Sequence, residues 1–138
     1  MSRPTAVIVD MDGTLADKIT DRKFSDWERV GEDVPYDDII DLVYILEKVY
    51  RILVVSGRME AAREPTRKWL RKYAVPYDCL YMRANGDFRS DEIVKEEIFH
   101  NEIEPHYDVK FVIDDRNKVV KMWRRIGLRC LQVQEGDF

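Results

Sequence analysis

Residues 6–15 read AVIVDMDGTL, an apolar run that leads directly into two carboxylates and a glycine. The run predicts a buried strand, so Asp10 and Asp12 lie where the chain leaves a sheet. Carboxylates are costly to bury there unless a cation neutralises them. Asp114 and Asp115 repeat the pattern after a second apolar run. We therefore expect all four acids to form one Mg²⁺ site, because oxygen-only ligands favour that ion over zinc.

Strand-like runs alternate with amphipathic stretches along the chain. Five runs have the apolar character of strands: Ala6–Val9, Ile52–Val55, Cys79–Met82, Lys110–Ile113 and Cys130–Val133. Between them, apolar residues recur at helical spacing over 39–49 and 119–126, while Pro65 and Asp91 mark the starts of two further helices, with Asp91 as a cap. The alternation predicts an α/β fold, a Rossmann-like parallel five-stranded sheet flanked by helices.

The stretch from Ala16 to Tyr36 interrupts this alternation. It is polar and has little periodicity over about twenty residues, which is long for a plain connection. We expect it to form a short flap, and residues 1–138 to form a single domain with no larger cap. The aromatic pair Phe24 and Trp27 fits either local core packing or stacking on a terminal base.

Composition excludes some classes of protein. The 138 residues carry 23 Lys and Arg against 27 Asp and Glu, a net charge of −4 that argues against a surface covered in nucleic-acid contacts. A local basic cleft stays open, because arginines gather in the middle third of the chain. No apolar run approaches the roughly 20 residues of a membrane span, and no signal peptide precedes Ala6. We expect a cytoplasmic protein with no membrane contact and with Cys79 and Cys130 as reduced thiols.

The acids after the first predicted strand suit phosphoryl transfer. Asp10 can attack phosphorus and form an aspartyl-phosphate that water later hydrolyses. Asp12 can protonate the leaving oxygen and then deprotonate the attacking water. Gly13 allows a tight turn, and the Thr14 hydroxyl is a candidate for substrate binding or for starting the next turn.

Further candidates accompany the later strands. Ser56 offers a hydroxyl and Arg58 a guanidinium, at the end of the second predicted strand, to surround phosphate oxygens. Lys95 precedes the Asp114 strand and can supply positive charge. Taken singly, Ser56 also fits a turn, Lys95 an exposed helix position and Asp115 a helix cap. Their arrangement at strand ends favours one catalytic site.

These residues, in this order, resemble the haloacid dehalogenase superfamily of phosphotransferases. The four motifs of that superfamily correspond to Asp10-Met11-Asp12-Gly13-Thr14, Ser56, Lys95 and Asp114-Asp115. The resemblance implies a haloacid dehalogenase-like fold, a bound Mg²⁺ and an aspartyl-phosphate intermediate. It also implies catalytic roles for Asp10, Asp12, Ser56 and Lys95.

A narrower resemblance covers essentially the whole chain. The phosphatase domains of bacteriophage polynucleotide kinase–phosphatases are similar to it at Val54–Arg58, Thr66–Trp69, Val94–Phe99, Ile113–Arg116, Met122–Gly127 and Gly136–Phe138. That family implies removal of 3′-phosphates from RNA or DNA ends before ligation, with kinase or ligase repair partners. A phage-encoded member would act in the host-cell cytoplasm. No GxxxxGK[ST] loop occurs, so a kinase domain is not expected.

The narrower resemblance also assigns site residues. The active-site positions of the family correspond to Asp10, Asp12, Arg58, Asp91, Lys95, Asp114 and Asp115. An arginine in the loop after the first motif corresponds to Arg22. Arg83 and Arg116 are further candidates for contacts with substrate phosphates.

Two other functions fit parts of the pattern. A phosphatase of small phosphomonoesters would use the same acids, but such enzymes often enclose their substrate under a larger lid. A receiver-type signalling module would need an acceptor aspartate after the third strand, where Arg83-Ala84-Asn85 stands instead. The sequence therefore predicts a Mg²⁺-dependent polynucleotide 3′-phosphatase, with small phosphomonoesters as the alternative substrates.

Overall fold

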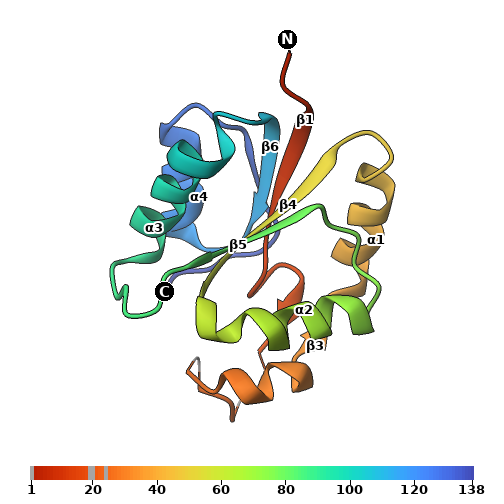
Figure 1. Cartoon of the computed structure of the whole chain (residues 1–138), viewed down its shortest axis with the longest axis vertical. Helices are drawn as coiled ribbons and strands as arrows, with labels where there is room; N and C mark the ends of the chain where they lie inside the picture. Colours follow the sequence, from red (N-terminus) through yellow and green to blue (C-terminus); the bar gives the residue numbers. More distant parts are fainter. Residues whose placement is uncertain (1, 19–20, 24) are drawn as a thin grey trace.

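A parallel five-stranded sheet forms the centre of the computed structural model, which describes residues 2–18, 21–23 and 25–138 (Figure 1). Its strands are β1 Thr5–Asp10, β4 Arg51–Met59, β5 Cys79–Arg83, β6 Asp108–Asp114 and β7 Cys130–Gln132. They follow the order β5-β4-β1-β6-β7, and every neighbouring pair is parallel. All five predicted strands are present, so the predicted α/β fold is confirmed.

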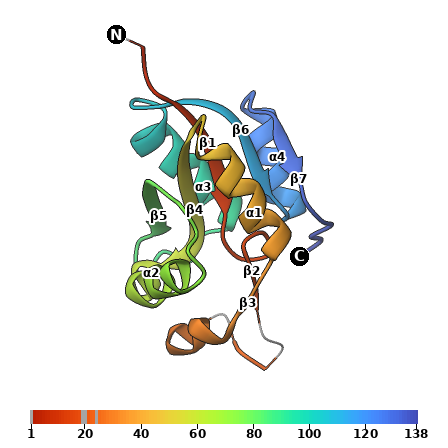
Figure 2. The same ribbon diagram turned by 90° about the vertical axis from the view of Figure 1, so that its right-hand side faces the viewer.

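Two helices cover each face of the sheet (Figures 1 and 2). The helices are α1 Asp37–Leu46, α2 Arg63–Lys72, α3 Asp91–Ile98 and α4 Asn117–Arg125, with short helical turns η1 Trp27–Glu32, η2 Glu60–Ala62 and η3 Phe99–Ile103. The α1 and α2 side chains pack with Val7 and Val9, whereas α3 and α4 pack with Ala6 and Ile8. Because successive strand residues face opposite ways, β1 is buried on both sides.

Two helix boundaries differ from the predictions. The predicted helix over 39–49 ends at Leu46, and Val49 lies in the following turn with 70% of its surface exposed. The prediction that Asp91 caps its helix is wrong: Ser90 is the flanking residue, and Asp91 is the first helical residue. The Asp91 carboxylate instead contacts arginine side chains, a stronger interaction than a backbone cap.

The flap is a small, structured element. Its two short strands, β2 Ala16–Asp17 and β3 Val34–Pro35, pair antiparallel, and η1 lies between them in sequence and packs against α2. Trp27 is partly buried against the core, as one of its two interpretations predicted. Phe24 lies outside the described residues.

Two expectations from composition concern the cysteines and the membrane. Cys79 and Cys130 are free thiols, and Cys130 is buried. Burial raises the pKa of the Cys130 thiol to about 12, so it is an inert core group. In the described part of the chain, no helix has the length and apolar character needed to cross a membrane.

Leu53 tests the central packing, because it is fully buried in β4 between neighbouring strands. We expect Leu53→Ala to lower the free energy of unfolding by about 2–5 kcal/mol, because apolar burial is reduced and a cavity remains. The control Ile45→Ala removes a side chain that is 65% exposed and should change stability by less than about 0.5 kcal/mol. Urea unfolding of both variants measures the difference, and equal effects would contradict the assignment.

Candidate active site

Three carboxylates meet at the carboxyl edge of the sheet. Asp10 ends β1, and Asp114 ends the neighbouring strand β6, directly before Asp115. One oxygen from each carboxylate lies within 4.8 Å of the others, and all three residues are buried. The parallel pairing of β1 and β6 therefore brings together acids that are about a hundred residues apart in the chain.

Lys95 supplies a positive charge inside this cluster. Its Nζ donates to Asp10 Oδ1 at 2.6 Å and to Asp114 Oδ2 at 3.3 Å, and only 1% of the residue is exposed. Burial alone lowers the pKa of Lys95, but Asp10 and Asp114 outweigh it and raise that pKa well above its ordinary value. Lys95 is thus a charged interior group, and its interpretation as an exposed helix lysine is wrong.

One ammonium leaves the three acids incompletely neutralised. Burial raises the pKa of Asp10 well above its ordinary value, and the carboxylates of Asp114 and Asp115 raise it further. Among the described residues, Asp115 Oδ1 is the one buried side-chain polar atom with no hydrogen-bond partner. An all-oxygen cluster with excess negative charge and an unsatisfied acceptor fits a hard divalent cation.

The orientation of these carboxylates is fixed by groups around them. Thr14 Oγ1 donates to Asp10 Oδ2 at 3.1 Å. Trp123 Nε1 donates to Asp114 Oδ2 at 3.2 Å, and the Asp115 backbone N–H donates to Asp114 Oδ1 at 2.8 Å. Asp115 does not cap α4, whose flanking residue is Arg116. Such contacts hold the acids in one arrangement before any ligand arrives.

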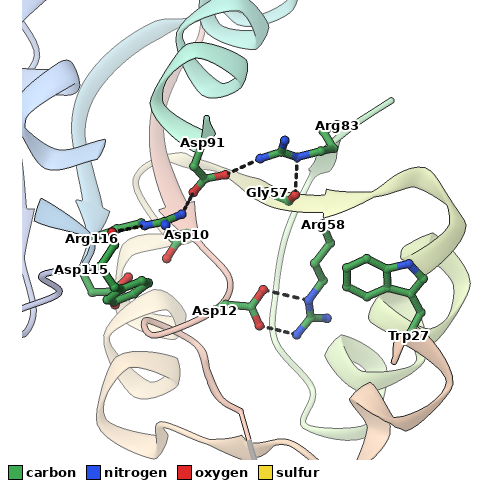
Figure 3. A pocket seen from close by; sticks show the side chains of 10 residues that line it. Asp10, Asp12, Trp27, Gly57, Arg58, Arg83, Asp91, Asp115 and Arg116 are labelled. Carbon is green, nitrogen blue, oxygen red and sulfur yellow. Dashed lines mark hydrogen bonds and ion pairs between the residues drawn. The ribbon is translucent and has the colours of Figure 1, made fainter. Parts of the chain in front are cut away.

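Asp12 has a different environment from the other acids. Its carboxylate accepts Arg58 Nε at 3.0 Å and Arg58 Nη2 at 2.7 Å, a bidentate pair seen in Figure 3. It is absent from the cluster of Asp10, Asp114 and Asp115. The prediction of an Asp12 side-chain metal ligand is therefore not supported, because the chain turns after β1 and directs this carboxylate toward Arg58. With 23% of its side chain exposed, Asp12 remains accessible to water.

Asp33 is a buried acid that was not predicted from the sequence, and it links the flap to the Asp12–Arg58 pair. Asp33 accepts Arg22 Nε at 2.9 Å and Arg22 Nη2 at 2.8 Å, and it also accepts Arg58 Nη2 at 3.1 Å. Its backbone carbonyl accepts the Trp69 indole N–H at 2.9 Å. The available sequence signal was weak: an acid eleven residues after Arg22 in the flap.

Three predicted substrate or catalytic contacts are interior groups. Arg22 is 1% exposed and holds Asp33, while Thr14 and Ser56 are fully buried. Ser56 Oγ accepts the backbone N–H of Arg58 at 3.1 Å. None of Arg22, Thr14 and Ser56 is among the residues that line the pocket, so their contacts with substrate stay predictions. Each still contacts a residue that lines it: Thr14 contacts Asp10, Ser56 contacts Arg58, and Arg22 Nη2 lies 3.9 Å from Asp12 Oδ1.

Asp91 joins the remaining predicted residues into a second charged group. It lies 3.0 Å from Arg83 Nη2, 3.5 Å from Arg116 Nη1 and 3.8 Å from Lys95 Nζ. Burial alone raises the pKa of Asp91, but Lys95, Arg116 and Arg83 outweigh it and lower that pKa. Arg83 also donates to the Gly57 carbonyl at 2.7 Å, so much of its donor capacity is used within the protein.

These groups surround a pocket of about 240 Å³. Its lining consists of Asp10, Asp12, Trp27, Gly57, Arg58, Arg83, Asp91, Asp115, Arg116 and Phe138. Figure 3 places Trp27 beside Arg58, across the pocket from Arg116. The pocket therefore combines the buried carboxylate of Asp10, the more exposed carboxylate of Asp12 and several guanidinium groups. Groups of these kinds can bind and transfer a phosphoryl group.

Gly13 tests how tightly this geometry is packed. Its φ is +88°, and a Cβ there would lie 2.1 Å from Asp115 Oδ2. We expect Gly13→Ala to lower the free energy of unfolding by at least about 1–2 kcal/mol, because a left-handed conformation and a clash with Asp115 combine. Gly31→Ala is the control, since no atom lies within 4 Å of that Cβ position. Similar urea midpoints for both variants would refute the close approach.

Comparison with known proteins identifies the family of this chain. A family model for the polynucleotide kinase PNKP phosphatase domain matches residues 4–138. A protein of Autographa californica nuclear polyhedrosis virus, assigned as a bifunctional polynucleotide kinase/RNA ligase, is 38% identical over 129 residues, which cover 91% of this chain and 18% of the viral protein.

Solved structures agree with that match. A chain in a Pnkp1/Rnl/Hen1 complex is 42% identical, with a TM-score of 0.94 over 99% of this chain and 48% of that one. A haloacid dehalogenase-superfamily hydrolase from Ehrlichia chaffeensis shares the fold, with a TM-score of 0.57 and 17% identity over 96% of this chain and 87% of that one. This chain thus spans less than half the length of its two closer relatives, and it belongs to the family of polynucleotide kinase PNKP phosphatase domains, within the haloacid dehalogenase superfamily.

Proposed function

We propose that this chain is a Mg²⁺-dependent phosphatase that removes 3′-phosphates from polynucleotide ends, with Asp10 as the nucleophile. One observation carries the proposal: Asp10 lines the pocket while Lys95 and Thr14 hold its two oxygens from within the protein. The family of the chain supports the substrate class. The reaction class follows from the carboxylates and guanidinium groups that share the pocket.

In the first step, an Asp10 oxygen attacks phosphorus, and the bond between phosphorus and the 3′ oxygen breaks. Asp12 donates its proton to that leaving oxygen. In the second step, Asp12 takes a proton from water, the water oxygen attacks the phosphoryl group, and the Asp10–phosphorus bond breaks. Arg58 holds Asp12 by its bidentate contact, and Asp12 itself lines the pocket and faces solvent.

A divalent cation fits the acidic cluster, and we propose Mg²⁺. Asp10, Asp114 and Asp115 would hold it, and the unsatisfied Asp115 Oδ1 supports this assignment. When bound, the ion neutralises the cluster and the charge of the phosphoryl oxygens. Lys95 offsets part of the same charge from the interior side of the site.

The short flap supports a polymer end as substrate. Among the described residues of 16–36, only Trp27 contributes to the pocket lining, so the described part of this chain places no large cap over the site. We propose that Trp27 packs against the terminal nucleoside and that Arg58 and Arg116 contact phosphate oxygens. Kinase or ligase modules are the proposed partners, in keeping with the relative assigned as a kinase/ligase and with the Pnkp1/Rnl/Hen1 complex.

Metal binding gives a prediction that is independent of turnover. Mg²⁺ at about 100 times its dissociation constant should add about 2.7 kcal/mol to stability, which raises the melting temperature by several degrees. Asp114→Asn should abolish most of that rise, because it removes a carboxylate from the cluster. Asp12→Asn is the matched control and should retain the rise. Differential scanning calorimetry with and without Mg²⁺ measures the rise in melting temperature of both variants. If Asp12→Asn lost the rise and Asp114→Asn kept it, the assignment of Asp114 as a metal ligand would be contradicted.

Substrate choice gives the direct test of function. We expect Mg²⁺-dependent phosphate release from a 3′-phosphorylated oligonucleotide and none from its 5′-phosphorylated counterpart. Asp10→Asn should reduce kcat by at least about 1,000-fold, because it removes the nucleophile. Inorganic phosphate release measures both. Equal release from both ends, or release only from a small phosphomonoester, would eliminate the polynucleotide assignment, and undiminished turnover by Asp10→Asn would eliminate the nucleophile.

A further inference from the structure

A second, open groove adjoins the pocket. It has a volume of about 970 Å³ and lies between α4 and the segment 132–138. Phe138 lines both the groove and the pocket. Arg116 Nε donates a hydrogen bond to the Phe138 carbonyl at 2.8 Å. A ligand that leaves the pocket past Phe138 therefore enters this groove directly.

The helical wall of the groove carries a row of cations. Lys118, Lys121 and Arg124 line it at intervals of three residues, so they share one face of α4 and span about 9 Å along the helix axis. Lys121 and Arg124 are exposed and Lys118 is half-buried. The core-facing positions of α4, among them Val120 and Trp123, hold the apolar contacts with the sheet. The cations are therefore not required by packing.

The cations retain capacity for an external ligand. Across residues 2–18, 21–23 and 25–138, Lys121 takes part in no ion pair or side-chain hydrogen bond. Lys118 donates to Ser90 Oγ at 3.1 Å and lies 3.9 Å from Glu92, and Arg124 donates to the Cys130 carbonyl at 3.0 Å. Each of these contacts leaves donor hydrogens unused.

The opposite wall is fixed in place and carries the opposite charge. Gln134 Nε2 donates to the Gly13 carbonyl at 2.7 Å, and Gly136 exchanges hydrogen bonds with Asn117 through its backbone carbonyl at 2.8 Å and its N–H at 3.1 Å. Glu135 and Asp137 on this wall are exposed. A polyanion would therefore follow the α4 wall, where the three cations lie, and keep away from the two acids.

We propose that this groove binds the backbone of a single-stranded polynucleotide on the 5′ side of the 3′-phosphate that is removed. The inference rests on the proposed function. A strand whose 3′ phosphate occupies the pocket can continue only in the 5′ direction, and the groove begins where the pocket ends. The 9 Å row of cations covers between two and three steps of about 3.4 Å along a stacked strand, which is room for about three successive phosphates. Interactions of this kind position a substrate without reading its sequence.

The test compares substrates of different length. Wild-type protein should bind a 3′-phosphorylated decanucleotide more tightly than a nucleoside 3′-monophosphate. Lys118→Gln and Lys121→Gln should each raise the decanucleotide KM about two- to fivefold, the range of an exposed ion pair, and leave kcat and the mononucleotide KM unchanged. The slope of log binding constant against log salt should become shallower by about 0.7 for each phosphate that the variant no longer neutralises.

Two control variants separate a local interaction from a general charge effect. Lys48→Gln removes the same charge in the turn after α1, at the opposite edge of the sheet, and should leave the decanucleotide KM unchanged. Glu135→Gln removes a repulsive charge from the groove and should lower that KM. Equal effects of Lys48→Gln and Lys121→Gln, or no effect of Lys118→Gln and Lys121→Gln, would overturn the proposal.

Fluorescence anisotropy with the same decanucleotide distinguishes this inference from the proposed function. If no 3′-phosphate is released but binding still depends on Lys118 and Lys121, the phosphatase assignment fails and the groove stands as a nucleic-acid surface. If 3′-phosphate is released and binding is indifferent to both lysines, the groove assignment fails alone. Weaker binding by the lysine variants with an unchanged melting temperature excludes a folding defect and supports the groove.

Discussion

The close approach of three buried carboxylates is the constraint on which the rest of this structure depends. Asp10, Asp114 and Asp115 repel one another in an environment with little water, and burial raises the pKa of Asp10 in response. Lys95 must therefore reach the cluster from α3. Helix α3 in turn packs against α4 and against strands β4 and β5. The architecture around the sheet edge thus follows from neutralising this charge.

A second set of ion pairs extends from that edge into the flap. Arg58 contacts both Asp12 and Asp33, and Asp33 also holds Arg22. The position of the proposed acid–base residue therefore depends on a flap carboxylate that does not line the pocket. Because removing one member of a buried pair leaves an uncompensated charge, this network couples the flap to the site more strongly than apolar packing alone would.

Local sequence patterns predicted the features that depend on neighbouring residues. Apolar runs predicted all five strands, and acids at their ends predicted which edge holds the site. The predictions were less accurate wherever a side chain had more than one available partner. Asp91 contacts arginines instead of capping α3, and Arg22 binds Asp33 instead of lining the pocket. Such choices depend on the positions of residues far away in the chain, which periodicity does not report.

The sequence by itself determined the fold class, the strand ends and the set of acids, because burial periodicity and turn residues act over a few positions. Only the tertiary structure decided that Asp12 pairs with Arg58 apart from the acidic cluster, that Asp33 joins the site, and that the α4 cations continue from the pocket. The physical reason is that ion pairs and grooves form between segments that the sheet brings together. Their partners are set by three-dimensional distance, whereas strands and helices are set by neighbours along the chain.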